Sequence, residues 1–379
     1  MIDVIIPVYK GARETRRCLD SVLGNAQREA FEVVAVDDAS PDPDIAALVR
    51  DLAAKGRITL VSNSTNAGFV HSVNRGMSLH PDRDVVLLNS DTEVANDWLD
   101  RLRQSVWSKP DIGTATPFSN NATICTYPFP GWAGGVPGTL GLAALDRMFA
   151  TINTGSTLDL PTAVGYCMYI RRACLEQVGL FDAERFGRGY GEENDFCRRA
   201  VHAGWRNVLA GDVYVFHEGA VSFAGERGER AEGALRALLD VHPDYLRLVR
   251  DFNLRDPVQA LRQVVDAARI ATGVEESSCV LAEQAAHRAQ LSARLAMAED
   301  LSEERTRVVG ELRQALSHAE ALLAVHTEEI GKLRAGLAHA EALVAAREAT
   351  IRKLSADLDR IRGIWLWRKF ESLMRRLRR

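Results

Sequence analysis

Four short apolar runs in the first part of the chain alternate with longer stretches in which apolar residues recur every three or four positions. The runs are DVIIPVY, FEVVAVDD, ITLVSN and DVVLLNSD, which begin at Asp3, Phe31, Ile58 and Asp84. A run that is apolar at nearly every position is typical of a strand buried on both faces, and the stretches between fit crossover helices. The pattern predicts an α/β fold with a mainly parallel sheet and flanking helices.

Polar residues close three of these runs. Asp37 and Asp38 end the second run, Asn63 ends the third, and the tripeptide NSD at residues 89–91 ends the fourth. Asn, Ser and Asp are also ordinary turn residues, so one such ending would carry little weight. Ligands of parallel sheets bind beyond the carboxyl ends of the strands, and three polar endings together therefore predict a site there.

The turn after the first run limits the chemistry of that site. Its sequence, PVYKGARET, lacks both the glycine pattern of a dinucleotide site and the phosphate-binding loop of nucleotide hydrolases. Carboxylates at strand ends do not bind a phosphate-bearing ligand directly, because a divalent cation must lie between them. Asp91, with Glu93 close by in the sequence, is the candidate carboxylate for such a cation.

A different pattern begins near Glu276, where the chain becomes a long polar helix without proline. The segment GELRQALSHAEALLA at Gly310 recurs as GKLRAGLAHAEALVA at Gly331, a shift of three heptads. One core position of the heptad is apolar throughout: Val309, Leu316, Leu323, Ile330, Leu337, Val344, Ile351, Leu358 and Trp365. The second core position is interrupted by His326 and Arg347. The pattern predicts a coiled coil that makes a homo-oligomer or folds back within the chain.

The last residues, LWRKFESLMRRLRR, form a separate amphipathic pattern. On a helical wheel the apolar side chains lie on one face and most of the basic ones on the other. The apolar set is Leu366, Trp367, Phe370, Leu373, Met374 and Leu377. Aromatic residues opposite cations favour a helix lying in an anionic membrane surface. A solvated helix end and a nucleic-acid-binding tail are the weaker interpretations, and no nucleic-acid partner is expected.

Composition adds the expected compartment. The chain has 379 residues, 46% hydrophobic and 26% charged, with a formal net charge of -4 that is too small to indicate a partner. Its six cysteines are scattered, which predicts neither a zinc site nor a disulfide framework. No apolar run is long enough to span a bilayer, and MIDVIIPVYK does not resemble a secretory leader. These features favour a cytoplasmic protein attached peripherally to the inner face of the cytoplasmic membrane.

Seven motifs, in order, resemble family 2 glycosyltransferases of the GT-A fold. They are IIPVYKGARET, VVAVDDASPD, NAGFVHSVNRGM, VLLNSDTEV, GYCMYIRRACLEQVGLFD, GYGEENDFCRRAVHAGWR and VYVFHEGAVSF, which together cover about Met1 to Ser222. The resemblance implies inverting transfer of a sugar from a nucleotide diphosphate donor to an acceptor hydroxyl. With a membrane-binding tail, the expected acceptor is a lipid-linked or cell-surface polysaccharide, and the expected source is bacterial.

The resemblance also assigns roles to residues. It implies a divalent cation, Mg²⁺ or Mn²⁺, held by Asp91 and His217, with Asn89 in place of the first Asp of the family's D-x-D motif. The donor-binding residues that it implies are Pro7, Tyr9, Asp37, Asp38, Asn66, Gly68, Asn74, Asn89 and Ser90.

The acidic pair Glu192 and Glu193 corresponds to the general base in that family, and we assign the base to Glu193 with Glu192 as the alternative. The same acids, followed by Asp195 and by arginines, would also suit a helix that merely complements its own dipole. A long segment, Thr116–Trp132, is expected to line the acceptor or sugar site, although it could be an ordinary surface connection.

The sequence thus predicts four parts: a GT-A glycosyltransferase domain at 1–250, a helical linker at 251–275, a coiled coil at 276–365 and a basic amphipathic tail at 366–379. Two other functions fit some of these features. A sugar-phosphate nucleotidyltransferase shares the strand pattern but should carry a Gly- and Arg-rich loop after the first strand. A catalytically silent coiled-coil scaffold would not need Asp91 or Glu193.

Overall fold

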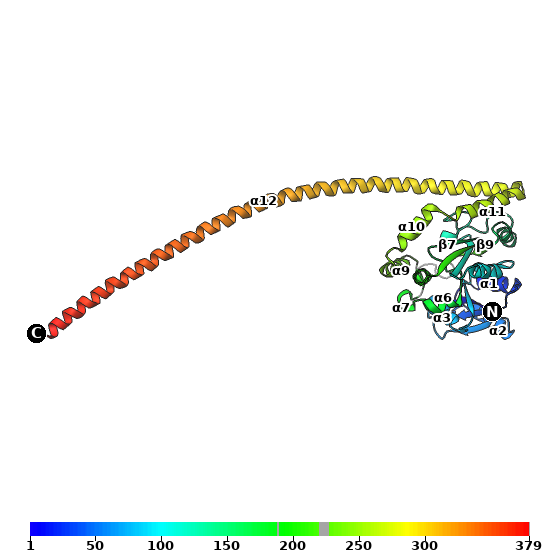
Figure 1. Cartoon of the computed structure of the whole chain (residues 1–379), viewed down its shortest axis with the longest axis horizontal. Coiled ribbons are helices and arrows are strands. Elements are labelled where there is room, and N and C mark those ends of the chain that lie inside the picture. Colours follow the sequence, from blue (N-terminus) through cyan, green and yellow to red (C-terminus); the bar gives the residue numbers. More distant parts are fainter. Residues whose placement is uncertain (188, 220–226, 379) are drawn as a thin grey trace. The chain divides into compact units, whose positions relative to one another are not determined.

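The computed structural model of the chain describes residues 1–187, 189–219 and 227–378. They form two compact units, Met1–Ala289 and Gln290–Arg379 (Figure 1). The first unit extends beyond residue 250, the expected end of the catalytic domain, because the following helices pack on it. The end of the last family motif, residues 220–223, lies outside the described residues.

A mixed sheet forms the centre of the first unit. Its strands are β1 (Ile2–Val8), β2 (Phe31–Asp37), β3 (Thr59–Ser62), β4 (Asp84–Leu88), β5 (Thr92–Glu93), β6 (Ile112–Ser119), β7 (Thr157–Leu160), β8 (Cys167–Ile170) and β9 (Arg206–His217). They lie in the order β3-β2-β1-β4-β8-β6-β9-β5, with β7 paired to β9. Strands β1 to β4, which the sequence predicted, are parallel to one another, whereas β8 is antiparallel to both of its neighbours.

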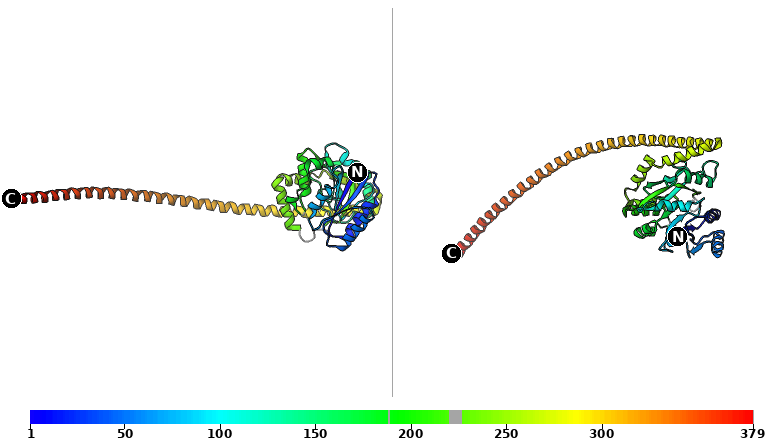
Figure 2. Two further views of the ribbon diagram at one scale, coloured as in Figure 1. Left: turned by 90° about the horizontal axis from the view of Figure 1, so that it is seen from below. Right: turned by 45° about the vertical axis from the view of Figure 1, so that its right-hand side comes forward.

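Helices cover both faces of this sheet (Figure 2). They are α1 (Ala12–Gly24), α2 (Pro43–Ala54), α3 (Phe69–Met77), α4 (Trp98–Trp107), η1 (Thr123–Cys125), α5 (Leu142–Ile152), α6 (Arg172–Val178), α7 (Ala183–Phe186), α8 (Glu192–His202), α9 (Arg227–Val241), α10 (Tyr245–Arg255), α11 (Gln259–Thr272) and α12 (Val274–Leu377). In β1, Val4 and Ile6 face the core under α1, α2 and α4, and Ile5 faces the core under α3, α6 and α8. Burial on both faces explains the continuous apolar runs, and the α/β prediction is confirmed.

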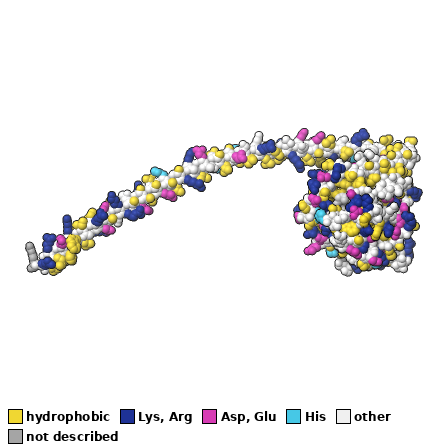
Figure 3. Space-filling view, in the orientation of Figure 1, with side chains coloured by type: hydrophobic (Ala, Val, Ile, Leu, Met, Phe, Trp, Pro, Cys, Tyr) yellow, Lys and Arg dark blue, Asp and Glu magenta, His cyan; other side chains and the backbone are white. Residues whose placement is uncertain are grey.

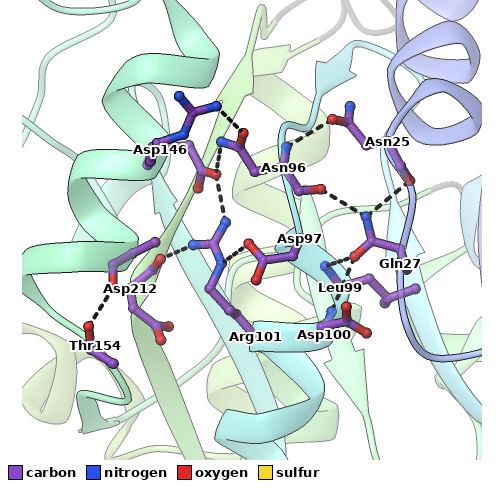
Figure 4. Close-up of polar contacts among 12 residues, drawn as sticks. Asn25, Gln27, Asn96, Asp97, Leu99, Asp100, Arg101, Asp146, Thr154 and Asp212 are labelled. Atoms are coloured by element: carbon purple, nitrogen blue, oxygen red, sulfur yellow. Dashed lines mark hydrogen bonds and ion pairs between the residues drawn. The ribbon is translucent and has the colours of Figure 1, made fainter.

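A buried ion network holds β9 in place (Figure 4). The Arg101 guanidinium of α4 donates to Asp146 of α5 at 2.6 Å, to Asp97 at 2.9 Å and to the carbonyl oxygen of Asp212 in β9. Asp146 also accepts the Tyr214 backbone N–H at 2.9 Å. Burial raises the pKa of Asp146, and the adjacent Arg101 opposes that rise. The network fixes the strand whose last residue is His217.

The first turns of α12 belong to the first unit, together with α11. Arg269 of α11 is fully buried and is paired with Glu276 and Glu283 of α12. Burial lowers the pKa of the guanidinium, but Glu283 and the Tyr127 hydroxyl outweigh this effect and raise it. Residues 251–289, which the sequence assigned to a linker and the start of a coiled coil, therefore contribute to this unit.

The second unit is one uninterrupted helix, the remainder of α12. Its predicted core positions are solvent-exposed in the single chain, among them Leu323 (68%) and Ile330 (50%). Figure 3 shows hydrophobic side chains at intervals along this helix. The long helix is confirmed, while its pairing into a coiled coil stays a prediction. None of the described helices combines the length and the apolar character needed to cross a membrane.

Candidate functional site

Asp38, directly after β2, organises the loop that leads into α3. Its carboxylate accepts the backbone N–H groups of Ala67 and Gly68, both at 2.8 Å, and the Asn63 amide at 2.7 Å. Gly68 has φ +90°, which an L side chain rarely adopts, and it is the residue before α3. Asp38 therefore shapes the edge of the site through these internal hydrogen bonds.

The neighbouring carboxylate and the end of β1 form a second part of this edge. One oxygen of Asp37 accepts the Ser40 backbone N–H at 2.8 Å, and the Ser40 hydroxyl donates to the carbonyl oxygen of Tyr9 at 2.6 Å. Pro7 lies opposite Val36 in the parallel pair of β1 and β2. The sequence predicted Pro7, Tyr9 and Asp37 together at this edge, and Ser40 is a further member.

Two other predicted donor-binding residues lie on and before α3. Asn66 is half-buried in the loop that Asp38 holds. Asn74 uses both ends of its amide on the backbone of Phe181, donating at 2.8 Å and accepting at 3.1 Å. Asn74 thus joins α3 to the segment before α7, and its amide is occupied there.

The turn after β4 places Asn89, Ser90 and Asp91 beside two other chain segments. The Asn89 backbone N–H donates to the Tyr166 carbonyl oxygen at 2.9 Å, and the Asp91 carbonyl oxygen accepts the Glu218 N–H at 3.0 Å. Ser90 and Asp91 are buried. The turn leads into β5, which pairs with the end of β9, so that Asp91 and His217 come together.

His217 is oriented towards Asp91 by its other ring nitrogen. Its Nδ1 lies 2.8 Å from the carbonyl oxygen of Asn121, and its Nε2 lies 3.5 Å from Asp91 Oδ1. A carbonyl oxygen only accepts, so Nδ1 carries a proton and Nε2 is the nitrogen that faces the carboxylate; in the neutral tautomer with this proton, Nε2 presents its lone pair there. A carboxylate oxygen and an imidazole lone pair facing each other form a donor set that fits a divalent cation, with Asn121 as the outer partner that fixes the ring.

Glu93 forms an ion pair with Arg17 instead of facing His217. Arg17 of α1 lies 3.1 Å from Glu93 and 2.7 Å from Glu218, and the two carboxylates raise the pKa of its guanidinium. The pairing joins α1 to β5 and to the residue after β9. Asp91, and not Glu93, is therefore the acidic side chain that faces His217.

Another group of possible metal ligands lies at the opposite edge of the sheet. Among the described residues, Asp3, Glu32 and His80 bring ligand atoms within 4.8 Å of one another, at the beginning of β1 and β2. Arg83 lies between the two acids, 3.0 Å from Asp3 and 2.6 Å from Glu32. Its guanidinium already supplies the positive charge, so this group is an ion-pair cluster.

Glu192 and Glu193 begin α8 after Gly191, whose φ of +88° turns the chain into the helix. Each carboxylate has a buried Oε2 that has no hydrogen-bond partner among the described residues. Burial raises the pKa of Glu192 well above its usual range, and the charge of Glu193 raises it further. Burial also raises the pKa of Glu193, but backbone N–H groups at the start of α8 oppose the rise. The pair therefore favours a proton on Glu192 and the charge on Glu193.

One short turn links this acidic pair to the turn that carries Asp91. A β-carbon placed on Gly165 would lie 3.5 Å from Cγ of Glu193, which is ordinary van der Waals contact. The next residue, Tyr166, accepts the hydrogen bond from Asn89 described above. Glu193 and the turn that carries Asp91 are thus held on either side of residues 165–166.

Sequence reasoning missed the residues that hold this arrangement. The Asn120 side chain accepts the His217 N–H at 2.8 Å and donates to the His217 carbonyl oxygen at 2.9 Å. Asn120, Asn121 and Tyr166 lie about fifty to one hundred residues from their partners in the chain. The motifs TPFSNNATI and VGYCMYI were visible in the sequence, but neither indicates its partner.

Comparison with known proteins finds similarity to one family in the first unit. Residues 3–179 match the model described as Glycosyl transferase family 2. Glycosyltransferase AglE of Haloferax volcanii is 23% identical over 217 residues, covering 57% of this chain and 66% of AglE. Glycosyltransferase GlyA of Streptococcus pneumoniae is 27% identical over 275 residues, covering 70% of this chain and 37% of GlyA. The matches thus span less than two thirds of the length of these relatives.

Two solved structures show a weaker likeness. A mannosyltransferase from Pyrobaculum calidifontis, in complex with GDP-Man and Mn²⁺, has a TM-score of 0.47 and 20% identity, covering 75% of this chain and 79% of its own. GalNAc-T7 with UDP, GalNAc and Mn²⁺ has a TM-score of 0.48 and 16% identity, covering 70% and 54%. Both scores are too low to bear on function. Over residues 3–179 of its first unit, the chain is thus similar to glycosyl transferase family 2.

Proposed function

We propose that the protein transfers a sugar, with inversion, from a nucleoside diphosphate donor to a hydroxyl of a lipid-linked or cell-surface glycan. One observation carries this proposal: the two carboxylates at the start of α8, each with one Oε2 that has no partner among the described residues, lie across residues 165–166 from the turn of Asp91. A base and a diphosphate site on the two sides of one turn are what a single displacement requires.

Glu193 is the proposed base. Its side chain is half-buried, whereas Glu192 is buried and its pKa is raised further by its neighbour. A base must be ionised and reachable from solvent, and Glu193 meets both conditions better. The Glu192 carboxyl, when protonated, leaves Glu193 the charged member of the pair.

In the proposed step, Glu193 accepts the proton of the acceptor hydroxyl. The hydroxyl oxygen forms a bond to the anomeric carbon while the bond from that carbon to the diphosphate oxygen breaks, and the electron pair leaves with the diphosphate. Asp91 and His217 Nε2 would hold a divalent cation, Mg²⁺ or Mn²⁺, which when bound neutralises charge on the diphosphate. Asp37 and the backbone near Tyr9 and Asn89 would contact the nucleoside.

The second unit would bring the enzyme to its acceptor. Pairing of the exposed seam between two copies would bury its leucines and isoleucines, and the tail at 366–379 would lie in an anionic membrane surface. Peripheral attachment suits a lipid-linked acceptor, because the acceptor itself is confined to that surface.

A donor panel tests the proposed function. The purified full chain is incubated with Mn²⁺ or Mg²⁺ and a series of nucleoside diphosphate sugars, and release of the nucleoside diphosphate is measured. We expect release from at least one donor, and its loss in Asp91→Asn. Release of pyrophosphate from a sugar phosphate and a nucleoside triphosphate would instead indicate a nucleotidyltransferase. No turnover of any substrate would favour the silent scaffold.

A further inference from the structure

We propose that the loop at residues 120–139, here called the acceptor loop, binds a sugar ring of the acceptor on the indole of Trp132. The inference rests on the proposed function and specifies its acceptor: the hydroxyl that reacts belongs to a glycosyl unit, and not to the lipid itself. Four sets of contacts carry it, and they run from the cation site to the tip of the loop.

The beginning of the acceptor loop is fixed to the cation site. The Asn120 amide donates to the carbonyl oxygens of His217, at 2.9 Å, and of Gly134, at 2.8 Å. The next residue, Asn121, holds the His217 ring through its own carbonyl oxygen. The Asn120 side chain thus connects the end of β9, where His217 lies, to Gly134 on the other side of the loop.

The middle of the loop is fixed to α11. The hydroxyl of Tyr127, which is fully buried, donates to Asp266 at 2.7 Å and accepts from Arg269 at 3.0 Å. Phe129 stacks on His287 of α12, with ring centroids 4.5 Å apart and planes inclined by 8°.

The end of the loop is fixed to α12. Glu276 accepts both the backbone N–H of Thr139, at 2.9 Å, and its hydroxyl, at 3.0 Å. The same carboxyl group pairs with the buried Arg269. A surface connection does not need so many buried anchors, whereas a binding loop gains specificity from being held in one conformation.

Between these anchors the tip of the loop is open to solvent. Gly131, Ala133, Gly134 and Gly135 are exposed, and Trp132 is half-buried among them. The Trp132 ring packs edge-on against Phe129, with centroids 5.4 Å apart. A β-carbon on Gly134 would lie 2.5 Å from Cζ2 of the indole, so the ring lies directly over Gly134. Gly134 is also the residue that Asn120 connects to His217.

The chemistry of the tip fits a sugar. A pyranose has an apolar face of C–H groups and a rim of hydroxyls, and an indole plane beside exposed backbone groups complements both. The tip carries no Lys, Arg, Asp or Glu between residues 126 and 139, so it offers no charged group to a phosphate or to an ammonium. A neutral glycosyl unit is the class of ligand that remains.

The glycine pair of the tip provides matched variants. Gly134→Ala would place a methyl group against the indole and displace it, whereas a β-carbon on Gly135 would meet nothing within 4 Å. The full chain is assayed with a donor that it cleaves, with octyl pyranosides or with octanol as acceptor. We expect transfer to a pyranoside and not to octanol. Trp132→Ala and Gly134→Ala should raise the KM for the pyranoside by about tenfold, with donor hydrolysis within about twofold of wild type. Trp132→Phe and Gly135→Ala should stay near wild type.

Unchanged KM in Trp132→Ala, or equal use of octanol and pyranosides, would overturn the inference while leaving the transferase intact. If no donor is cleaved, the proposed function fails by itself, and a binding measurement still decides the inference. Saturation-transfer NMR with methyl pyranosides should show contact at the ring C–H protons in the wild-type chain and in Gly135→Ala, and its loss in Trp132→Ala. Equal signals in all three would reject the sugar platform.

Discussion

The Tyr166 ring stacks on the His217 ring, with centroids 5.1 Å apart and planes inclined by 16°. The Tyr166 hydroxyl donates to the carbonyl oxygen of Pro117 at 2.6 Å, which fixes the tyrosine in the core. His217 is therefore restrained on its face by Tyr166 and at Nδ1 by Asn121, and both restraints direct Nε2 towards Asp91. Such outer partners determine the orientation of a metal-binding imidazole.

Removing the charge of Asp91 should uncouple the cation from the donor. In Asp91→Asn we expect the affinity for nucleoside diphosphate with Mn²⁺ to fall by at least about tenfold, because cation and diphosphate binding are linked. Titration calorimetry measures the affinity for nucleoside diphosphate with and without Mn²⁺, and the ratio of the two affinities gives the linkage. Asp3→Asn, in the cluster that Arg83 already neutralises, is the control and should leave this linkage unchanged. Linkage that is also unchanged in Asp91→Asn would exclude Asp91 as a ligand.

Replacing Glu193 should remove the base and its pH dependence. Burial raises the pKa of Glu193, so its proton is retained to higher pH and the wild-type rate should rise with pH through that raised pKa. Glu193→Gln should lower kcat by roughly 10²- to 10⁴-fold and abolish this acidic limb, with donor affinity nearly unchanged. Glu192→Gln should lower kcat by a smaller factor than Glu193→Gln does. If Glu192→Gln lowers kcat more than Glu193→Gln does, the base is Glu192. Full transfer by both variants would exclude the mechanism.

A methyl group at Gly138 should loosen the acceptor loop. Gly138 and Gly141 have nearly equal φ angles, +73° and +75°, but only at Gly138 would a β-carbon overlap Glu276 and Arg269. Both alanine variants incur backbone strain of about 1–3 kcal/mol from the positive φ. Gly138→Ala should destabilise the first unit by a further ~2 kcal/mol or more, because it displaces a buried ion pair. Thermal denaturation measures the stability of the two variants. Equal losses of stability would show that Glu276 and Arg269 do not hold the loop.

Charges in the seam should break the predicted coiled coil. Leu323→Asp with Ile330→Asp would bury carboxylates between paired helices and should reduce the mass measured by light scattering. Ala324→Asp with Ala335→Asp adds the same charge away from the seam and should leave the mass unchanged. If the wild-type chain is already monomeric, the seam does not pair between copies.

Removal of residues 362–379 should release the protein from anionic vesicles. The apolar tail residues are exposed in the single chain, among them Trp367 (62%) and Phe370 (53%). Trp367→Ser with Phe370→Ser keeps the basic charge and should weaken cosedimentation at moderate salt, since cations alone are screened. Donor hydrolysis should be unaffected in both forms. Cosedimentation of the truncated chain at the same salt would place membrane binding elsewhere.

Several features of this protein were already determined by its sequence. Strands β1 to β4 could be predicted because burial on both faces demands an apolar residue at nearly every position, which is a local pattern. The acids at strand ends could be predicted for the same reason, since each follows directly from where its strand stops. The long helix followed from its heptads, whose spacing is also local.

The tertiary structure decided which polar groups remain available for chemistry. Asp38 and Asn74 were predicted to bind the donor, but their polar atoms are engaged by Gly68 and Phe181, whose positions no local pattern specifies. Likewise, Asn121 and Tyr166 orient His217, and Arg269 joins α11 to the acceptor loop, across about fifty to one hundred and forty residues of sequence. A hydrogen bond depends on the distance between two atoms in the folded chain, whereas periodicity depends only on neighbours, and for that reason the sequence indicated the site but not the contacts that build it.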